Sequence, residues 1–81
     1  MKSVDLLIVE YPGDDAWSRF ATATGAADEE VDSVARALLG TAAHQWLQTP
    51  LGALDGHSPS DVIVAESQGQ RAIRSLMMRM P

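Results

Sequence analysis

Apolar residues recur along the chain with the spacing of short amphipathic helices. The clearest case is Val31, Val34, Ala35 and Leu38, which follow one another at intervals of three and four residues. This spacing places the four side chains on one face of an α-helix, and Gly40 stands where a C-terminal cap belongs. The pattern therefore predicts a helix that begins near residue 31 and ends before residue 40.

Two more helices are indicated by residues that start and stop a helix. Asp14 or Asp15 can act as the N-terminal cap of a helix that ends near Gly25. Thr41 can cap a third, short helix, which has to end at Pro50 because the residue before a proline avoids the helical conformation. Both segments carry a tryptophan, and we expect each tryptophan to lie in the core.

The second half of the chain contains the strongest helix-start signal. Ser58 can act as the N-terminal cap, Pro59 stands at the first helical position, and the acidic Asp61 follows three residues after the cap. Apolar residues 62–64 fill this short helix. The last helix is predicted to begin near Ser67 and to present one apolar side, made by Ala72, Ile73, Leu76, Met77 and Met80.

Residues 4–11, with the sequence VDLLIVEY, permit two interpretations. As an extended strand they have two apolar faces, Val4, Leu6 and Ile8 on one and Leu7, Val9 and Tyr11 on the other. No comparable second strand is predicted, so this one would have to pair outside its own chain. The alternative is a helix with one apolar stripe, formed by Val4, Leu7, Ile8 and Tyr11.

These patterns predict a mainly α fold, a small bundle of four to five short helices with an N-terminal β-strand used for dimer pairing. Residues 1–30 are expected to form an acidic N-terminal part, with the strand, a short helix and the dimerisation segment. Residues 31–81 are expected to form a helical binding domain. A chain of 81 residues buries only about 60–65% of its unfolded surface, so a homodimer or a bound partner would add stability.

Composition excludes several classes of protein. The chain has no cysteine, which removes disulfides and thiolate metal sites. Its net charge of −5 arises in residues 1–40, where eight acids face three basic residues, while residues 41–81 are neutral. An acidic half repels phosphate, so specific DNA binding is not expected. No apolar run approaches the ~20 residues of a membrane span, and we interpret the protein as cytoplasmic.

Candidate catalytic residues are few. His44 and His57 lack the i, i+4 spacing of a helical metal pair. A triad of Ser58, His44 and Asp55 can be drawn, but Ser58 already has a sufficient role as a helix cap. The glycines form no phosphate-binding loop. The sequence therefore predicts no enzyme, no metal site and no cofactor.

The last helix carries the strongest candidate for a binding surface. Arg71, Arg74 and Arg79 fall within an arc of about 140° at the helical rotation of about 100° per residue, opposite the apolar side. Arginine and methionine are enriched at protein interfaces, so these three arginines with Met78 are the predicted partner-binding residues. The alternative is that they form the solvated face of a core helix.

Several stretches of the second half resemble one family. Residues 46–50 (WLQTP) and 54–59 (LDGHSP) resemble the WLxTP…LxGxSP motif of the toxin-binding domain in Xre/MbcA/ParS antitoxins. Residues 35–40, 66–69 and 73–76 resemble the helix before this motif, the turn after it and the closing helix. Seven motif residues are expected to be structural: Trp46, Leu47, Pro50, Leu54, Gly56, Ser58 and Pro59.

The resemblance covers roughly residues 31–80 and implies an antitoxin that neutralises a RES-domain toxin. Such a toxin consumes NAD or transfers an ADP-ribosyl group from it. The resemblance therefore assigns the NAD chemistry to the toxin and not to this chain. Family members usually carry an N-terminal helix-turn-helix, and the acidic stretch of about thirty residues before the resemblance is expected to leave too little room for it. Promoter binding is therefore not carried over, and the alternative is a related transcriptional regulator with a reduced DNA-binding part.

Overall fold

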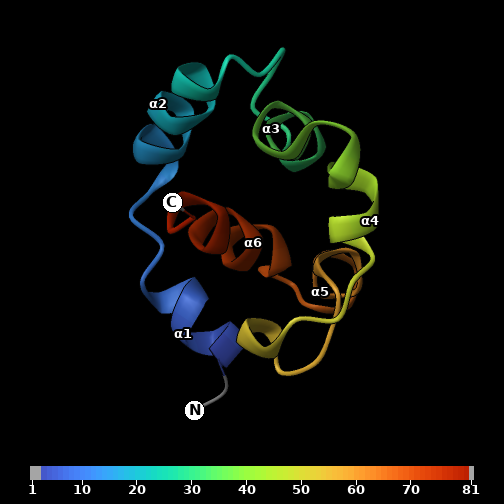
Figure 1. Ribbon diagram of the computed structural model, residues 1–81. Helices are drawn as coiled ribbons and strands as arrows, with labels where there is room; N and C mark the ends of the chain where they lie inside the picture. The colour runs from blue at the N-terminus through green and yellow to red at the C-terminus, as the bar shows by residue number, and fades with distance from the viewer. Residues whose placement is uncertain (1–2, 81) are drawn as a thin grey trace.

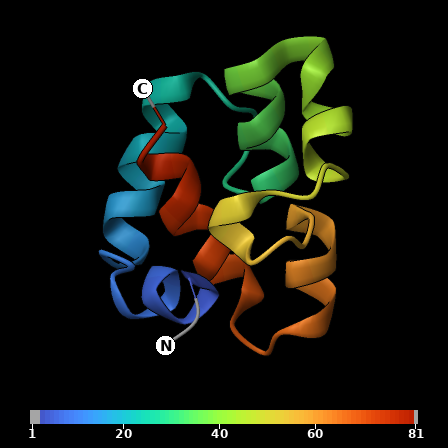
Figure 2. The same ribbon diagram turned by 60° about the horizontal axis from the view of Figure 1, so that its bottom comes forward.

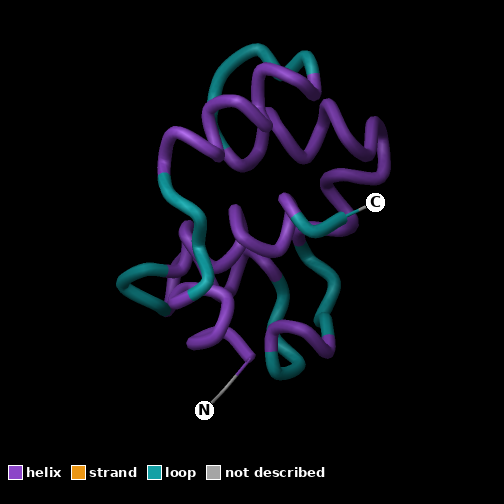
Figure 3. The backbone as a smooth tube through the Cα atoms, turned by 90° about the vertical axis from the view of Figure 1, so that its left-hand side faces the viewer, coloured by secondary structure: helices purple, strands orange, loops and turns teal. Residues whose placement is uncertain are grey.

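The computed structural model describes residues 3–80, and all regular secondary structure in that range is helical (Figure 3). Two 3-10 turns, η1 (Gly40–Ala42) and η2 (Gly52–Leu54), accompany six α-helices. The prediction of a small, mainly α bundle is confirmed, with more helices than the four to five expected. The helices are α1 (Ser3–Val9), α2 (Asp14–Thr24), α3 (Val31–Leu39), α4 (Ala43–Leu47), α5 (Pro59–Ala65) and α6 (Gly69–Met78).

Helix α6 lies at the centre of the molecule, and the other helices surround it (Figures 1 and 2). It packs most closely against α1 and α5 and also contacts α2 and α3. Of its predicted apolar side, Ala72, Ile73 and Met77 are fully inaccessible to solvent, whereas Leu76 and Met80 are partly buried. The rest of the core comes from every other α-helix and η2: Val4, Leu7, Trp17, Ala21, Val31, Val34, Ala35, Ala43, Leu54 and Val62.

The predicted N-terminal β-strand is wrong, because residues 3–9 form helix α1. Val4 and Leu7 are buried, and Ile8 and Tyr11 pack against the core, which is the stripe of the helical alternative. A helix pairs its own backbone groups, whereas a lone strand leaves them unpaired. The main-chain N–H groups of Ser3 and Val4 donate to the Asp55 carboxylate at 3.3 and 3.4 Å, so a distant residue caps the helix.

The start signal at Ser58 is confirmed in detail. The Ser58 hydroxyl accepts a hydrogen bond from the Asp61 N–H at 3.2 Å, and Pro59 occupies the first turn of α5. Helix α3 ends at Gly40, which has a φ of 60° that only glycine adopts easily. The start of α2 differs from the prediction, since Gly13 takes the capping position and Asp14 is the first helical residue.

The two tryptophans differ in their depth in the bundle. Trp17 is fully buried, and its indole N–H donates to the Glu29 carbonyl at 2.7 Å. Trp46, with Leu47 beside it, is only partly buried at the edge of the core. The core therefore depends on the N-terminal part of the chain as well as on residues 31–80.

Candidate functional site

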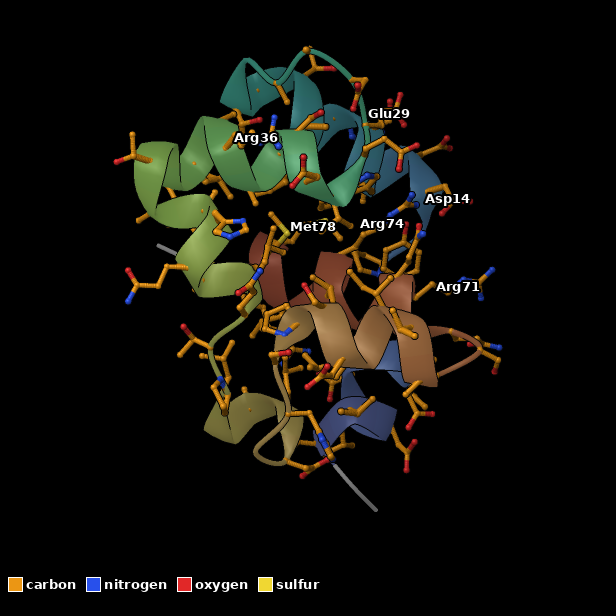
Figure 4. The ribbon with its side chains drawn as sticks, turned by 90° about the vertical axis from the view of Figure 1, so that its right-hand side faces the viewer. Asp14, Glu29, Arg36, Arg71, Arg74 and Met78 are labelled. Carbon is orange, nitrogen blue, oxygen red and sulfur yellow. The ribbon has the colours of Figure 1, made fainter. Side chains whose placement is uncertain are left out.

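The arginines of α6 lie on the side of this helix that faces the connection between α1 and α2. Figure 4 shows Arg74 directed toward Asp14, with Arg71 extending outward beside it. Arg79 follows directly after the helix. We call residues 10–14 the 10–14 segment; it has the sequence EYPGD and joins α1 to the first residue of α2.

Arg74 is held by three residues of the N-terminal part. Its Nη1 donates to the Tyr11 hydroxyl at 3.4 Å and lies 3.5 Å from the Asp14 carboxylate. Its Cζ lies 5.2 Å from the centroid of the Trp17 ring, a cation–π arrangement. Only 20% of the side chain is exposed, and Nε is buried without a hydrogen-bond partner. The Arg74 guanidinium group is therefore already held by contacts within the chain.

Arg79 and Arg71 also contact the 10–14 segment but remain open to solvent. Arg79 forms an ion pair with Glu10, and about half of each side chain is exposed. The Arg71 Cζ lies 5.9 Å from the centroid of the Tyr11 ring, and Arg71 is exposed. Both guanidinium groups can reach a partner without a change in the core.

Tyr11 connects the charged groups of this site. Its hydroxyl donates to the Asp14 carboxylate at 2.7 Å while accepting from Arg74. Burial, reinforced by the hydrogen bond to Asp14, raises the pKa of Tyr11 above its ordinary value, and Arg74 partly opposes the shift. The phenol therefore stays protonated at neutral pH and continues to donate to Asp14.

A cavity of about 430 Å³ opens beside these arginines, at the start of α6. Arg71, Arg74 and Asp14 line one part of it, and Ile63 with residues 66–70 lines the rest. The lining contains two arginines, two carboxylates from Asp14 and Glu66, and the polar side chains of a serine and two glutamines. This mixture suits a polar, hydrogen-bonding group better than an apolar one.

The region that carries this cavity matches a known protein family. Residues 34–80 fit the family model of the C-terminal toxin-binding domain of the antitoxins Xre/MbcA/ParS, over more than half of the 81 residues. The chain belongs to this antitoxin family. No curated protein and no solved structure gave a significant match.

The toxin-binding domain of this antitoxin-family chain begins within α3 and includes all of α4, α5 and α6. The seven motif residues lie at different depths in the bundle. Leu54, Ser58 and Pro59 are buried, Trp46 and Leu47 pack at the edge of the core, and Pro50 and Gly56 are exposed. The turn of residues 51–57 is closed by a hydrogen bond of 3.1 Å from the Leu51 N–H to the His57 carbonyl.

Met78 follows Arg74 by four residues, so the two side chains lie on the same side of α6, and Figure 4 shows them near each other. Met78 is partly buried against the core near the end of α6 and does not line the cavity (Figure 4). Its predicted place in the partner-binding set therefore differs from that of Arg71 and Arg74, which share one cavity wall.

Two residues of the domain have roles that the sequence analysis missed. Asp55 caps α1 across the chain, and Gly69 allows α6 to touch α5. A Cβ atom at Gly69 would lie 2.1 Å from the Val62 carbonyl oxygen, closer than real atoms approach. Gly69 closes the ExxG stretch of residues 66–69, so the resemblance contained a signal for it. Asp55 gave no local signal.

The structure shows no catalytic arrangement of the residues considered for one. His44 and His57 are both exposed, and the Ser58 hydroxyl serves the helix cap. Across residues 3–80, no three His, Cys, Asp or Glu side chains are grouped so that they could hold a metal ion. Within the same range, no helix is long and apolar enough to cross a membrane.

Proposed function

We propose that this chain is a non-catalytic antitoxin that binds and neutralises a RES-domain toxin. Such a toxin is an enzyme that consumes NAD or transfers an ADP-ribosyl group from it. The observation that carries the proposal is the family match over residues 34–80, which gives the chain a toxin as its partner. The toxin class comes from the resemblance of the motif residues to the family. In this proposal the chain needs no cofactor, because the toxin carries the chemistry.

The contact surface in this proposal is the arginine face of α6. Arg71 is exposed and Arg79 is about half exposed, so both can form charged hydrogen bonds with a partner. Arg74 is mostly buried and holds the 10–14 segment in place, and the 20% of its side chain that is exposed can also contact a partner. Met78, four residues after Arg74 and directly before Arg79, would supply apolar contact within the surface.

Exposed arginines contribute little to folding, so their effect on binding can be separated from stability. The double variant Arg71→Gln/Arg79→Gln is expected to melt close to the wild type. It is also expected to weaken binding of a cognate RES-domain toxin by about 1–3 kcal/mol. Co-expression with the toxin, scored by growth and cellular NAD, together with titration calorimetry measures the effect.

The matched control is Arg19→Gln/Arg36→Gln, which removes the same charge from two exposed arginines of α2 and α3. This control is expected to protect cells as well as the wild type. Full protection by the folded Arg71/Arg79 variant would remove these residues from the surface. A wild-type chain that neither binds nor neutralises the toxin would contradict the proposed toxin class.

Self-association through residues 1–30 is a second part of the proposal. Self-association can no longer be argued from strand pairing, because residues 3–9 form a helix. Helix α1 nevertheless exposes two apolar residues to solvent, Leu6 at 43% and Val9 at 70%. Apolar side chains grouped on a surface favour association. Leu6→Lys/Val9→Lys is expected to shift the protein from dimer to monomer in sedimentation, whereas Val64→Lys, at an 87% exposed position of α5, leaves the mass unchanged. A wild-type monomer would contradict this part.

A further inference from the structure

One short segment of the chain contacts all three arginines of the α6 face. Glu10 pairs with Arg79, the Tyr11 ring lies under Arg71, and Tyr11 and Asp14 both contact Arg74. These contacts bring residues together across as many as 69 positions of sequence. The 10–14 segment thus provides two carboxylates and a phenol to a surface of three guanidinium groups.

The charged contacts of this segment are weak enough to be exchanged. The Asp14 side chain is 77% exposed, and the Glu10–Arg79 pair is about half exposed on both sides. Ion pairs at this exposure contribute about 0–1 kcal/mol each, because water screens and solvates both partners. Arg74 stays in place without Asp14, because its guanidinium is also stacked on the buried Trp17. Another carboxylate can therefore replace Asp14 without opening the core.

The cavity beside Arg71 and Arg74 provides room for such a replacement. Its volume of about 430 Å³ accommodates more than one side chain, and it adjoins the Asp14 carboxylate. Glu66 is the other acid on its wall, so two positive and two negative groups face the space. The first turn of α6 adds the partial positive charge of a helix N-terminus. Loss of Asp14 from the wall would leave a net positive lining.

From these contacts we infer that the arginine face of α6 and its cavity bind an acidic segment of a partner protein. In the free chain, the 10–14 segment occupies part of this site as an internal substitute for the partner's carboxylates. The inference deepens the proposed function, since it gives the chemistry of the toxin segment that this surface recognises. The net charge of −5 means that local contacts, and not long-range attraction, select the segment.

If the 10–14 segment competes with the partner, removing its acidic groups should raise the affinity for an acidic segment and not lower it. Asp14→Asn removes a competitor, so it is expected to raise the affinity for an acidic segment. Glu10→Gln frees Arg79 and is expected to act in the same direction. If these acids only supported the fold, their removal would leave the affinity unchanged or lower it.

A synthetic polyglutamate peptide is a suitable probe, titrated into the full chain while amide and arginine Nε–Hε signals are followed by NMR. Saturable shifts are expected at residues 66–71 and at the Arg71 and Arg74 side chains. Asp14→Asn is expected to tighten binding about threefold, the equivalent of one exposed ion pair. Arg71→Gln is expected to weaken it about tenfold, the equivalent of one charged hydrogen bond. Arg36→Gln, which lies away from the cavity, serves as the unchanged control.

Absence of saturable shifts at the cavity would overturn the inference, and so would equal shifts with a polylysine peptide. Unchanged or weaker binding by both Asp14→Asn and Glu10→Gln, with melts close to the wild type, would overturn the role of the 10–14 segment. The titration contains no toxin, so a negative result in it would not contradict the proposal that the chain neutralises a toxin. Conversely, a chain that binds polyglutamate but protects no cell from a RES-domain toxin keeps this site and loses the proposed function.

Discussion

Replacing Gly69 with alanine is expected to lower the free energy of unfolding by about 3 kcal/mol or more. The added Cβ would lie 2.1 Å from the Val62 carbonyl oxygen and 2.9 Å from the Ile63 Cα, both main-chain atoms of α5. Alanine in a helix otherwise gains about 0.5–1 kcal/mol over glycine, so the clash outweighs this gain. Helix α5 would have to move away from α6. Urea denaturation monitored by circular dichroism measures the loss.

Gly52→Ala is the matched control for this substitution. Its Cβ would have no atom within 4 Å, and its backbone does not require glycine. We expect a change of about 0.5 kcal/mol or less in its free energy of unfolding. Equal midpoints for the two alanine variants would show that α5 and α6 are not in the close contact described above.

Truncating Trp17 to alanine is expected to lower the free energy of unfolding by about 3–5 kcal/mol. A domain of this size has a total of about 4–12 kcal/mol, so much of the folded population would be lost. The side chain is fully buried, donates to Glu29 and supports the guanidinium of Arg74. Removing it leaves a cavity and takes away the contact that holds Arg74 on the Trp17 ring.

Trp46→Ala removes the same side chain from a partly buried position and is expected to have a smaller effect. The sequence alone predicts both tryptophans to lie in the core, and only Trp46 belongs to the motif that resembles the family. The structure assigns the deeper position to Trp17, which precedes the matched residues 34–80. If Trp46→Ala lowered the urea midpoint more than Trp17→Ala, the motif would be the better guide to the core.

The features that the sequence predicted are those with local causes. Ser58 and Pro59 start a helix through contacts within four residues, and Gly40 ends one through its own backbone angle. The burial of Ile73 and Met77 opposite the arginines follows from helical periodicity. The same periodicity placed the arginines on one face of α6.

The features that could not be predicted from the sequence depend on contacts between residues far apart in the chain. Residues 4–11 suit a strand or a helix, and the choice depends on docking of α1 against α6 and on the cap from Asp55, which is 52 positions from Ser3. Arg74 and Tyr11 are separated by 63 positions, so no local pattern shows that the arginine face is already in contact with the chain itself. Tertiary contacts decided both cases.

The central position of α6 also determines when during protein synthesis the bundle can fold. Ribosomes make a chain from its N-terminus, and α6 follows the other five described α-helices in the sequence. Until residues 69–78 emerge, α1, α2, α3 and α5 lack the helix against which they pack. A nascent chain of this protein therefore cannot complete its core until α6 has been made, although pairs such as α2 and α3 can already be in contact.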